Sequence, residues 1–208
     1  MTDAETLVAA ILEKLQEQVS IVDHLIGLVP ADRLSFRPLL AQTPPPSAGN
    51  THGMTTAVDE RPGYSGHRPV TDASQVADTV HLMNLSQLLG HLLECLAGFC
   101  ALLYKLNPDA LSHFQALREK PVNHECSPAE AKPRLAEYMT HINDGFKLMS
   151  DNDLKKPVAT IFAPAGESVM TLLLGNLEHL INHKHQLFIY LRLLGVQLGT
   201  PDLYKLRG

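Results

Sequence analysis

The sequence predicts an all-α fold, a four-helix bundle, from three observations. Four segments repeat apolar residues at three- and four-residue steps, the spacing that gives a helix one apolar face. No segment shows the sustained alternation of apolar and polar residues that marks a half-buried strand. The chain has 208 residues, 45% of them hydrophobic, which is enough for one sizeable core. Four amphipathic helices of this length pack most simply as an up-and-down bundle.

The first predicted helix ends at Pro30, because proline cannot continue a helix. Charged and amide residues lie between its apolar positions, so it has one apolar and one polar face. Its predicted buried row is Val8, Ile11, Leu15, Val19, Val22, Leu25 and Val29.

The second predicted helix runs from about Thr79 to Leu106, and Asn107-Pro108 ends it. Its apolar face is wide, which indicates contact with more than one neighbour. Its longest unbroken apolar run has about ten residues, well short of the ~20 that cross a bilayer, so we expect a buried helix. Its predicted buried row is Leu82, Leu85, Leu89, Leu92, Leu96, Phe99 and Leu103.

The third predicted helix has the clearest start. Ser127 can cap it, Pro128 fits the first helical position, and Glu130 completes the capping pattern three residues after the cap. The buried row predicted for this helix is Leu135, Tyr138, Ile142, Phe146 and Met149.

The fourth predicted helix runs from about Glu167 to Leu194, and Gly195 is its expected C-terminal cap. Polar residues interrupt the row that is predicted to be the most deeply buried on this helix. That row is Leu172, Asn176, His179, His183, Gln186 or Leu187, Tyr190 and Leu194.

Residues 41–78 separate the first two predicted helices and are rich in proline and glycine. We interpret them as a long inserted loop within a single bundle domain that spans residues 1–208. Loop statistics favour a floppy insertion over a functional lid.

Charge and cysteine content exclude several classes of protein. The 17 Lys and Arg residues against 22 Asp and Glu residues give a formal charge of -5, which argues against nucleic acid or an anionic membrane as a partner. The three cysteines form no Cys-x-x-Cys pair and no disulfide framework. The first residues lack the basic flank and apolar segment of a signal peptide. We therefore predict a cytoplasmic protein.

The 11 histidines are the unusual feature of the composition. His179 and His183 are four residues apart, so they share one helix face with β-carbons about 5–6 Å apart and can bind one cation. The same spacing also arises by chance, but these two lie on the predicted seam, where an unpartnered imidazole would cost about 1–3 kcal/mol. His91, near the middle of the second helix, is the candidate third ligand. The other histidines show no paired spacing and are treated as surface or core residues, namely His24, His52, His67, His81, His113, His124 and His141.

Other chemistries have less support. A ferritin-like di-iron site needs Glu-x-x-His motifs on two helices, and no histidine here follows a glutamate at that spacing. No Gly-x-Ser-x-Gly motif supports a serine nucleophile. Cys95 could be a reactive thiol near a metal, although a small buried apolar residue is the favoured interpretation. Glu94 could hold the second ring nitrogen of His91 or act as a general base, although a solvated glutamate is the default expectation.

Three motifs resemble the DinB/YfiT superfamily. Residues 86–91, Ser-Gln-Leu-Leu-Gly-His, resemble the Ser-x-x-x-x-His start of that family's second helix. Residues 179–195 resemble its fourth-helix motifs His-x-x-x-His-Arg-Gly-Gln and Tyr-Leu-Arg-x-x-Gly, with Lys184 and His185 in place of Arg-Gly. Residues 34–38, Leu-Ser-Phe-Arg-Pro, are similar to its Leu-x-Trp-Arg-Pro segment. The resemblance covers most of the chain outside the insertion.

The resemblance implies a four-helix bundle in which His91, His179 and His183 hold a divalent metal ion. Neutral imidazoles suit zinc, nickel, copper or iron, and the affinity order does not choose among them. Three protein ligands leave open coordination positions, which is the arrangement of catalytic sites. His185 lies on a different face of the helix and is expected to be exposed.

The resemblance also implies a function. Characterised branches of the family include transferases and isomerases that use low-molecular-weight thiols, and other members are described as metal-dependent hydrolases. We therefore expect a metal-dependent enzyme of the thiol-dependent S-transferase type, acting on a small molecule and forming a homodimer. A hydrolase that activates water, or a non-catalytic stress-response protein stabilised by its metal, are the alternatives. No catalytic residue is assigned.

Overall fold

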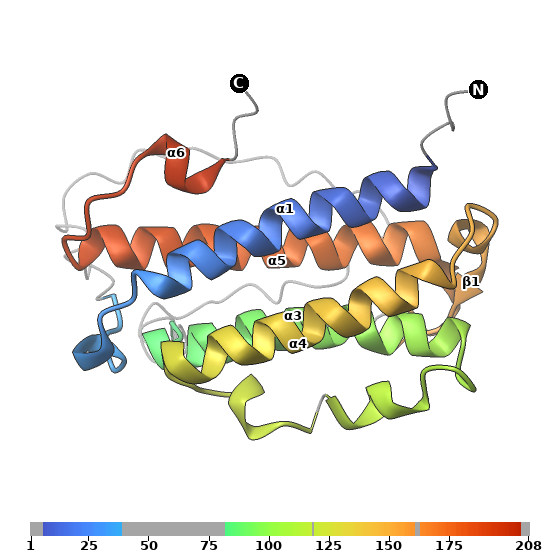
Figure 1. Cartoon of the computed structure of the whole chain (residues 1–208), viewed down its shortest axis with the longest axis horizontal. Coiled ribbons are helices and arrows are strands. Elements are labelled where there is room, and N and C mark those ends of the chain that lie inside the picture. The colour runs from blue at the N-terminus through green and yellow to red at the C-terminus, as the bar shows by residue number, and fades with distance from the viewer. Residues whose placement is uncertain (1–5, 39–81, 118, 161–162, 205–208) are drawn as a thin grey trace, which may run out of the picture. The chain divides into compact units, whose positions relative to one another are not determined.

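The structure, a computed structural model, describes residues 6–38, 82–117, 119–160 and 163–204. Its main elements are four long helices that belong to one compact unit: α1 (Leu7–Gly27), α3 (Leu85–Leu106), α4 (Pro128–Lys147) and α5 (Val169–Leu193) (Figure 1). The prediction of an all-α four-helix bundle is confirmed. The predicted inserted loop, residues 41–78, and the predicted helix start at Thr79 lie outside the described residues.

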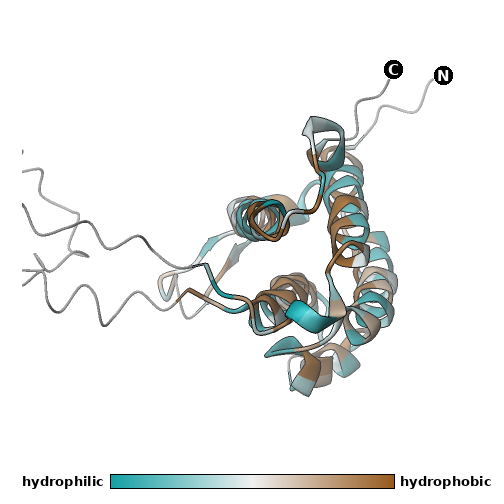
Figure 2. Ribbon diagram, turned by 90° about the vertical axis from the view of Figure 1, so that its left-hand side faces the viewer, coloured by the Kyte–Doolittle hydropathy of each residue, from teal (hydrophilic) through white to brown (hydrophobic). Residues whose placement is uncertain are grey.

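Each long helix has two neighbours. α1 packs on α4 and α5, and α3 packs on the same two helices, so α1 and α3 occupy opposite corners of the bundle. Figure 2 views the bundle along its length, and each helix carries both hydrophobic and hydrophilic residues, as amphipathic helices do. The core therefore lies between all four helices.

The direction of the helices differs from a simple up-and-down bundle. In Figure 1, α1 and α5 run one way, while α3 and α4 both run the other way. Gly145 near the end of α4 packs against Leu103 near the end of α3, which agrees with a parallel pair. The reason is the connection: residues 107–127, with the 3-10 helices η2 (Ser112–Leu117) and η3 (Pro121–Asn123), lead back along the bundle before α4 begins.

Shorter elements close the ends of the bundle. A 3-10 turn, η1 (Ala31–Arg33), follows α1, and another, η4 (Asp153–Lys155), follows α4. Strand β1 (Pro157–Val158) pairs antiparallel with β2 (Glu167–Ser168), directly before α5. A one-turn helix, α6 (Thr200–Leu203), follows α5.

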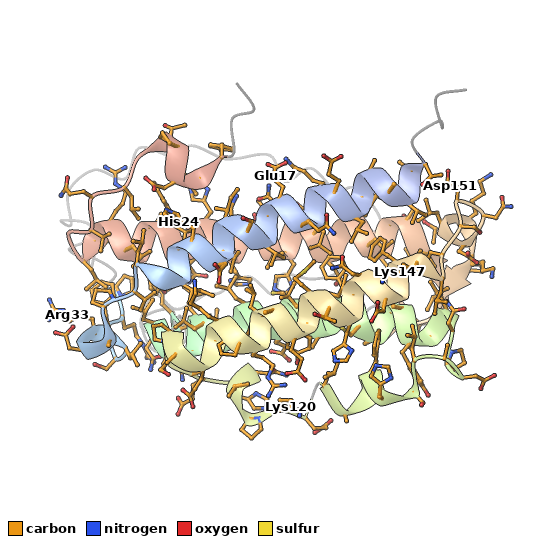
Figure 3. The ribbon with its side chains drawn as sticks, in the orientation of Figure 1. Glu17, His24, Arg33, Lys120, Lys147 and Asp151 are labelled. Atoms are coloured by element: carbon orange, nitrogen blue, oxygen red, sulfur yellow. The ribbon has the colours of Figure 1, made fainter. Side chains whose placement is uncertain are left out.

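Side chains cap the helix starts. Ser127 and Glu130 form the predicted capping box of α4, and Asn84 with Gln87 forms the same arrangement at α3. The carboxylate of Asp151 accepts hydrogen bonds from the first two backbone N–H groups of α1, at 3.2 and 3.0 Å, which places the α4–α5 connection over that helix start (Figure 3). After the C-terminal end of α5, Gly195 has φ +86°, the left-handed conformation expected of a C-terminal cap.

The buried rows predicted for α1, α3 and α4 are buried, except that Leu82 and Met149 are only partly so. The prediction for α5 is wrong: the row expected to be the most deeply buried is not, because His179 is exposed and His183 is only half-buried. The helix turns a neighbouring row into the core. That row is Val169, Leu173, Leu177, Leu180, Lys184, Leu187 and Leu191.

Helix α3 is the one helix in the described part of the chain that is long and apolar enough to cross a membrane. However, 67% of its most apolar stretch is buried inside the protein. Its apolar surface is therefore used for packing against α4 and α5, as predicted for a core helix.

Candidate metal centre

The packing of α3 against α5 brings the three predicted ligands together. The two helices are antiparallel, and Gly98 of α3 lies against Asn176 of α5. Because the helices run in opposite directions, moving back from Gly98 to His91 on α3 corresponds to moving forward from Asn176 to His183 on α5. His179 lies one turn before His183 on the same face.

The three imidazoles meet through their Nε2 atoms. The Nε2 of His91 lies 3.2 Å from the Nε2 of His179 and 3.1 Å from the Nε2 of His183. The rings contact one another edge to face, with centroids 4.3 to 5.1 Å apart. The Nε2 of His91 is therefore close to the Nε2 of both His179 and His183 on α5.

The second nitrogen of two of these rings has its own partner. The Nδ1 of His91 lies 3.3 Å from a carboxylate oxygen of Glu94, and the Nδ1 of His183 lies 2.9 Å from the amide oxygen of Gln186. Both partners accept hydrogen bonds, so each Nδ1 carries the proton and each Nε2 presents a lone pair. Glu94 is exposed, as the default expectation had it, and it also contacts His91.

Burial lowers the pKa of all three imidazoles below the usual range. Repulsion from a neighbouring imidazole lowers each pKa further, while the hydrogen bonds that His91 donates to Glu94 and His183 donates to Gln186 oppose the shift at these two rings. The net effect favours neutral rings, the form in which imidazole binds a metal.

The donor set fits a divalent cation. Two neutral Nε2 atoms 3.1 Å apart, each with its proton on Nδ1, cannot hydrogen-bond to each other. Bonds of about 2.0–2.1 Å from a tetrahedral zinc ion would place its nitrogen ligands about 3.3 Å apart, close to the separations between His91 and the other two rings. The separations of His91 from His179 and from His183 therefore suit a shared cation, and the ligand atoms of His91, Cys95 and His179 also lie within 4.8 Å of one another.

The centre lies at the rim of the bundle. His179 is exposed and the side chain of His91 retains 26% of its accessible surface. This position follows from the rotation of α5 that places the neighbouring row in the core. A small molecule can therefore reach the centre from solvent.

Cys95 offers a second candidate donor set. Its Sγ, one turn after His91 on α3, lies within 4.8 Å of ligand atoms of His91 and His179. Burial first, and then the charge of Glu94, raises the pKa of Cys95 to about 12. A thiol that binds a metal gives up its proton, so Cys95 is an alternative third donor to His183 beside His91 and His179.

The other histidines in the described part of the chain mostly match their default assignment, and His52, His67 and His81 lie outside the described residues. His185 is exposed, as expected, and His24 pairs with Asp202 at 2.9 Å. The structure also shows a histidine pair that sequence spacing did not predict. The Nε2 of His113 lies 3.2 Å from the Nδ1 of His141. These two residues come from η2 and α4, and no local periodicity connects them.

Taken together, the fold and the centre define a helical bundle with a cluster of histidines and a cysteine that can hold a metal ion. Neither a family model nor a curated protein sequence matches the chain. Its structure is similar to the crystal structure of a DinB-like protein, YjoA, from Bacillus subtilis, with a TM-score of 0.59. The match covers 94% of this chain and 99% of that chain, at 16% sequence identity. The chain thus has the DinB-like fold, and the prediction of that fold is confirmed.

Proposed function

We propose that this chain is a DinB-like metal-binding protein in which His91, His179 and His183 hold one divalent cation, with zinc, nickel and iron as the candidate metals. The supporting observation is that the Nε2 of His91 lies 3.2 Å from the Nε2 of His179 and 3.1 Å from the Nε2 of His183, in rings whose pKa is lowered by burial. The orientation of His91 and His183 by Glu94 and Gln186 adds to it.

We further propose that the protein is a thiol-dependent S-transferase. A divalent cation at this centre supplies Lewis acidity, which lowers the pKa of an incoming low-molecular-weight thiol. The sulfur forms a bond to a carbon electrophile, the leaving group departs with its bonding electrons, and the thiol proton passes to solvent. The thiol is external because Cys95, Cys100 and Cys126 are all buried, which raises the pKa of each to about 12.

A hydrolase is the second candidate, favoured by one observation. The carboxylate of Glu94 is half-exposed beside His91, where it can accept a proton from a water molecule that attacks an ester or amide. In a third, non-catalytic candidate, the cation joins α3 to α5 and stabilises the fold.

Metal content tests the site. We expect wild-type protein without a tag to hold one equivalent of zinc, and the variants H91A, H179A and H183A to lose it, as measured by elemental analysis after equilibration with zinc. The variant H185A removes an exposed histidine from the same helix and should keep the full equivalent. Retention of a full equivalent by each of the three ligand variants would refute the site.

Turnover tests the reaction. We expect zinc-loaded protein to consume monochlorobimane only when a thiol such as cysteine, glutathione, bacillithiol or mycothiol is supplied, and the H179A variant to lose this activity. Hydrolysis of p-nitrophenyl acetate without thiol, lost in E94Q, would instead support the hydrolase. A large drop in thermal stability on chelation, without turnover of either kind of substrate, would support the non-catalytic candidate.

Assembly and location remain predictions. We propose a homodimer, which is supported by apolar residues exposed on α5, including Met170, Leu174, Ile189 and Leu193. A mass near 22.8 kDa by light scattering would contradict it. We also propose a cytoplasmic location, with no nucleic acid or membrane as a partner.

A further inference from the structure

A chain of three hydrogen bonds connects His183 to a backbone carbonyl at the start of α3. The Nδ1 of His183 lies 2.9 Å from the Oε1 of Gln186, and the Nε2 of Gln186 donates to the hydroxyl of Tyr190 at 3.0 Å. That hydroxyl donates to the carbonyl oxygen of Met83 at 2.9 Å. Gln186 and Tyr190 follow His183 by one and two turns of α5, so all three share one face.

The donor and the acceptor of each of these three hydrogen bonds follow from the last group in the series, the carbonyl of Met83. The carbonyl of Met83 can only accept, so the O–H of Tyr190 donates to it and the Tyr190 oxygen is left to accept. The amide of Gln186 must then turn its NH₂ group toward Tyr190 and its oxygen toward His183. His183 therefore donates from Nδ1, and its Nε2 is left as a lone pair 3.1 Å from the Nε2 of His91.

The far end of the chain is firmly held. Tyr190 is buried, and burial raises the pKa of its hydroxyl, which keeps it a donor at neutral pH. The ring of Phe36 packs edge-on against the Tyr190 ring, with centroids 5.9 Å apart. The carbonyl of Phe36 accepts a hydrogen bond from the backbone N–H of Leu85, the first residue of α3, at 2.9 Å.

His91 is held differently. Its Nδ1 lies 3.3 Å from Glu94, whose side chain retains 47% of its accessible surface, and an exposed carboxylate can exchange this contact for water. The partly buried series of hydrogen bonds behind His183 has a shorter distance at each step than this contact and ends on the backbone. His183 is therefore the more firmly oriented of these two rings.

We propose that Gln186 and Tyr190 are positioning residues that fix His183 in the Nδ1–H tautomer, with its Nε2 aimed at the metal centre. The inference rests on the proposed function, since it assigns these residues to the same site. Neither residue touches the cation; both act through His183.

The zinc affinity of the protein and the tautomer of His183 test this inference together. In Q186L the acceptor is lost, and we expect zinc affinity, measured by competition with a chromophoric chelator, to fall roughly 10- to 100-fold. In Q186E a carboxylate oxygen replaces the acceptor, so affinity should return toward the wild-type value. In Y190F the chain is cut one step further away, and we expect a smaller fall than in Q186L.

A matched control separates positioning from stability. Tyr138 is a buried tyrosine of α4 whose hydroxyl accepts a hydrogen bond from Asn123 away from the centre, so Y138F should cost stability but leave zinc affinity unchanged. In metal-free protein, the ¹⁵N shifts of His183 should show the Nδ1–H form in wild type and in Q186E, and a mixture of tautomers in Q186L.

Equal zinc affinity in Q186L and wild type, or an unchanged His183 tautomer in Q186L, would overturn the inference. Its failure is distinct from that of the proposed function. Wild-type protein that binds no zinc, yet shows the Nδ1–H tautomer lost in Q186L, would refute the metal site while supporting the orienting chain.

Discussion

At the scale of single residues, two neighbours on α5 have opposite surroundings. Lys184 is only 3% exposed, and its ammonium donates to the side chain of Gln18 at 2.7 Å and to the carbonyl of Leu203 at 3.3 Å. Consecutive residues on a helix point about 100° apart, because a turn takes 3.6 residues. With Lys184 held against α1 and the C-terminal segment, His183 must turn toward α3. The side chain of Lys184 thus lies in the core, while the neighbouring His183 faces α3.

The third ligand can be identified with cobalt. We expect Co²⁺-loaded wild type to lack a sulfur-to-cobalt charge-transfer band, and C95S to bind Co²⁺ as wild type does, because the proposed site takes His183 as its third ligand and binding through the buried Cys95 would first have to displace the proton of its thiol. Absorption spectra and a Co²⁺ titration measure both. The control is C100S, which changes a thiol whose pKa burial also raises to about 12. A band present in C100S and lost in C95S would make Cys95 a ligand.

At this scale the sequence predicted the candidate ligands but not the residues that contact them. His91, His179 and His183 follow from spacing and from a family resemblance, and the structure brings them together. Lysine is almost never fully buried, so nothing in the pattern placed Lys184 in the core. The part played by Gln186 depends on a carbonyl of Met83, distant in sequence, and only the packed structure reveals it.

At the scale of elements, helix starts could be predicted and helix faces only in part. The start of α4 followed from local chemistry, because Ser127 and Glu130 need nothing beyond their own turn to form a capping box. The inward face of α5 did not, because two neighbouring rows both show helical spacing and tertiary packing chooses between them. The row with Leu173 and Leu180 is the one buried.

Two glycines in long helices should respond in opposite ways to alanine. A β-carbon on Gly90 would lie 2.5 Å from the carbonyl carbon of His124 and 2.6 Å from the backbone nitrogen of Glu125, so the backbone itself would have to move. We expect G90A to lower the free energy of unfolding by about 1–3 kcal/mol. Gly175 has open space around the same position, so G175A should raise it by about 0.5–1 kcal/mol through better helix propensity.

Urea unfolding measures the change in the free energy of unfolding of both glycine variants, provided that the slope of this free energy against urea concentration is unchanged. The pair serves as its own control, since both substitutions add one methyl group inside a helix. A G90A protein as stable as wild type would contradict the close approach of the segment before α4 to α3.

At the scale of the whole molecule, the metal centre joins segments that are distant along the chain. The long return through η2 and η3 makes α3 and α4 parallel and leaves α5 as the antiparallel neighbour of α3. A cation shared by His91, His179 and His183 would therefore cross-link α3 to α5. The helices and the candidate ligands could be predicted from the sequence, but the helix directions could not, because they depend on a connection without periodicity.

The cross-link predicts a thermal shift. If zinc binds the folded protein alone, a zinc concentration 100-fold above Kd adds about 2.7 kcal/mol of stability. For a chain of this length that raises Tm by roughly 5–11 °C, measurable by calorimetry with and without a chelator. The shift should persist in H185A and disappear in H179A; an equal shift in both variants would place the zinc elsewhere.

The pH dependence of that shift follows from the lowered pKa of the three imidazoles. An unfolded histidine binds a proton near pH 6.5, whereas burial keeps these folded rings neutral to lower pH. As the pH falls, the unfolded chain therefore takes up protons first, and metal-free protein loses stability below about pH 6.5. Zinc still finds neutral ligands in that range, so the zinc-induced rise in Tm should survive at pH 6.5 and decline only at lower pH, as protons compete for Nε2. A rise already lost on going from pH 7.5 to about pH 6.5 would mean that the three rings titrate as ordinary histidines.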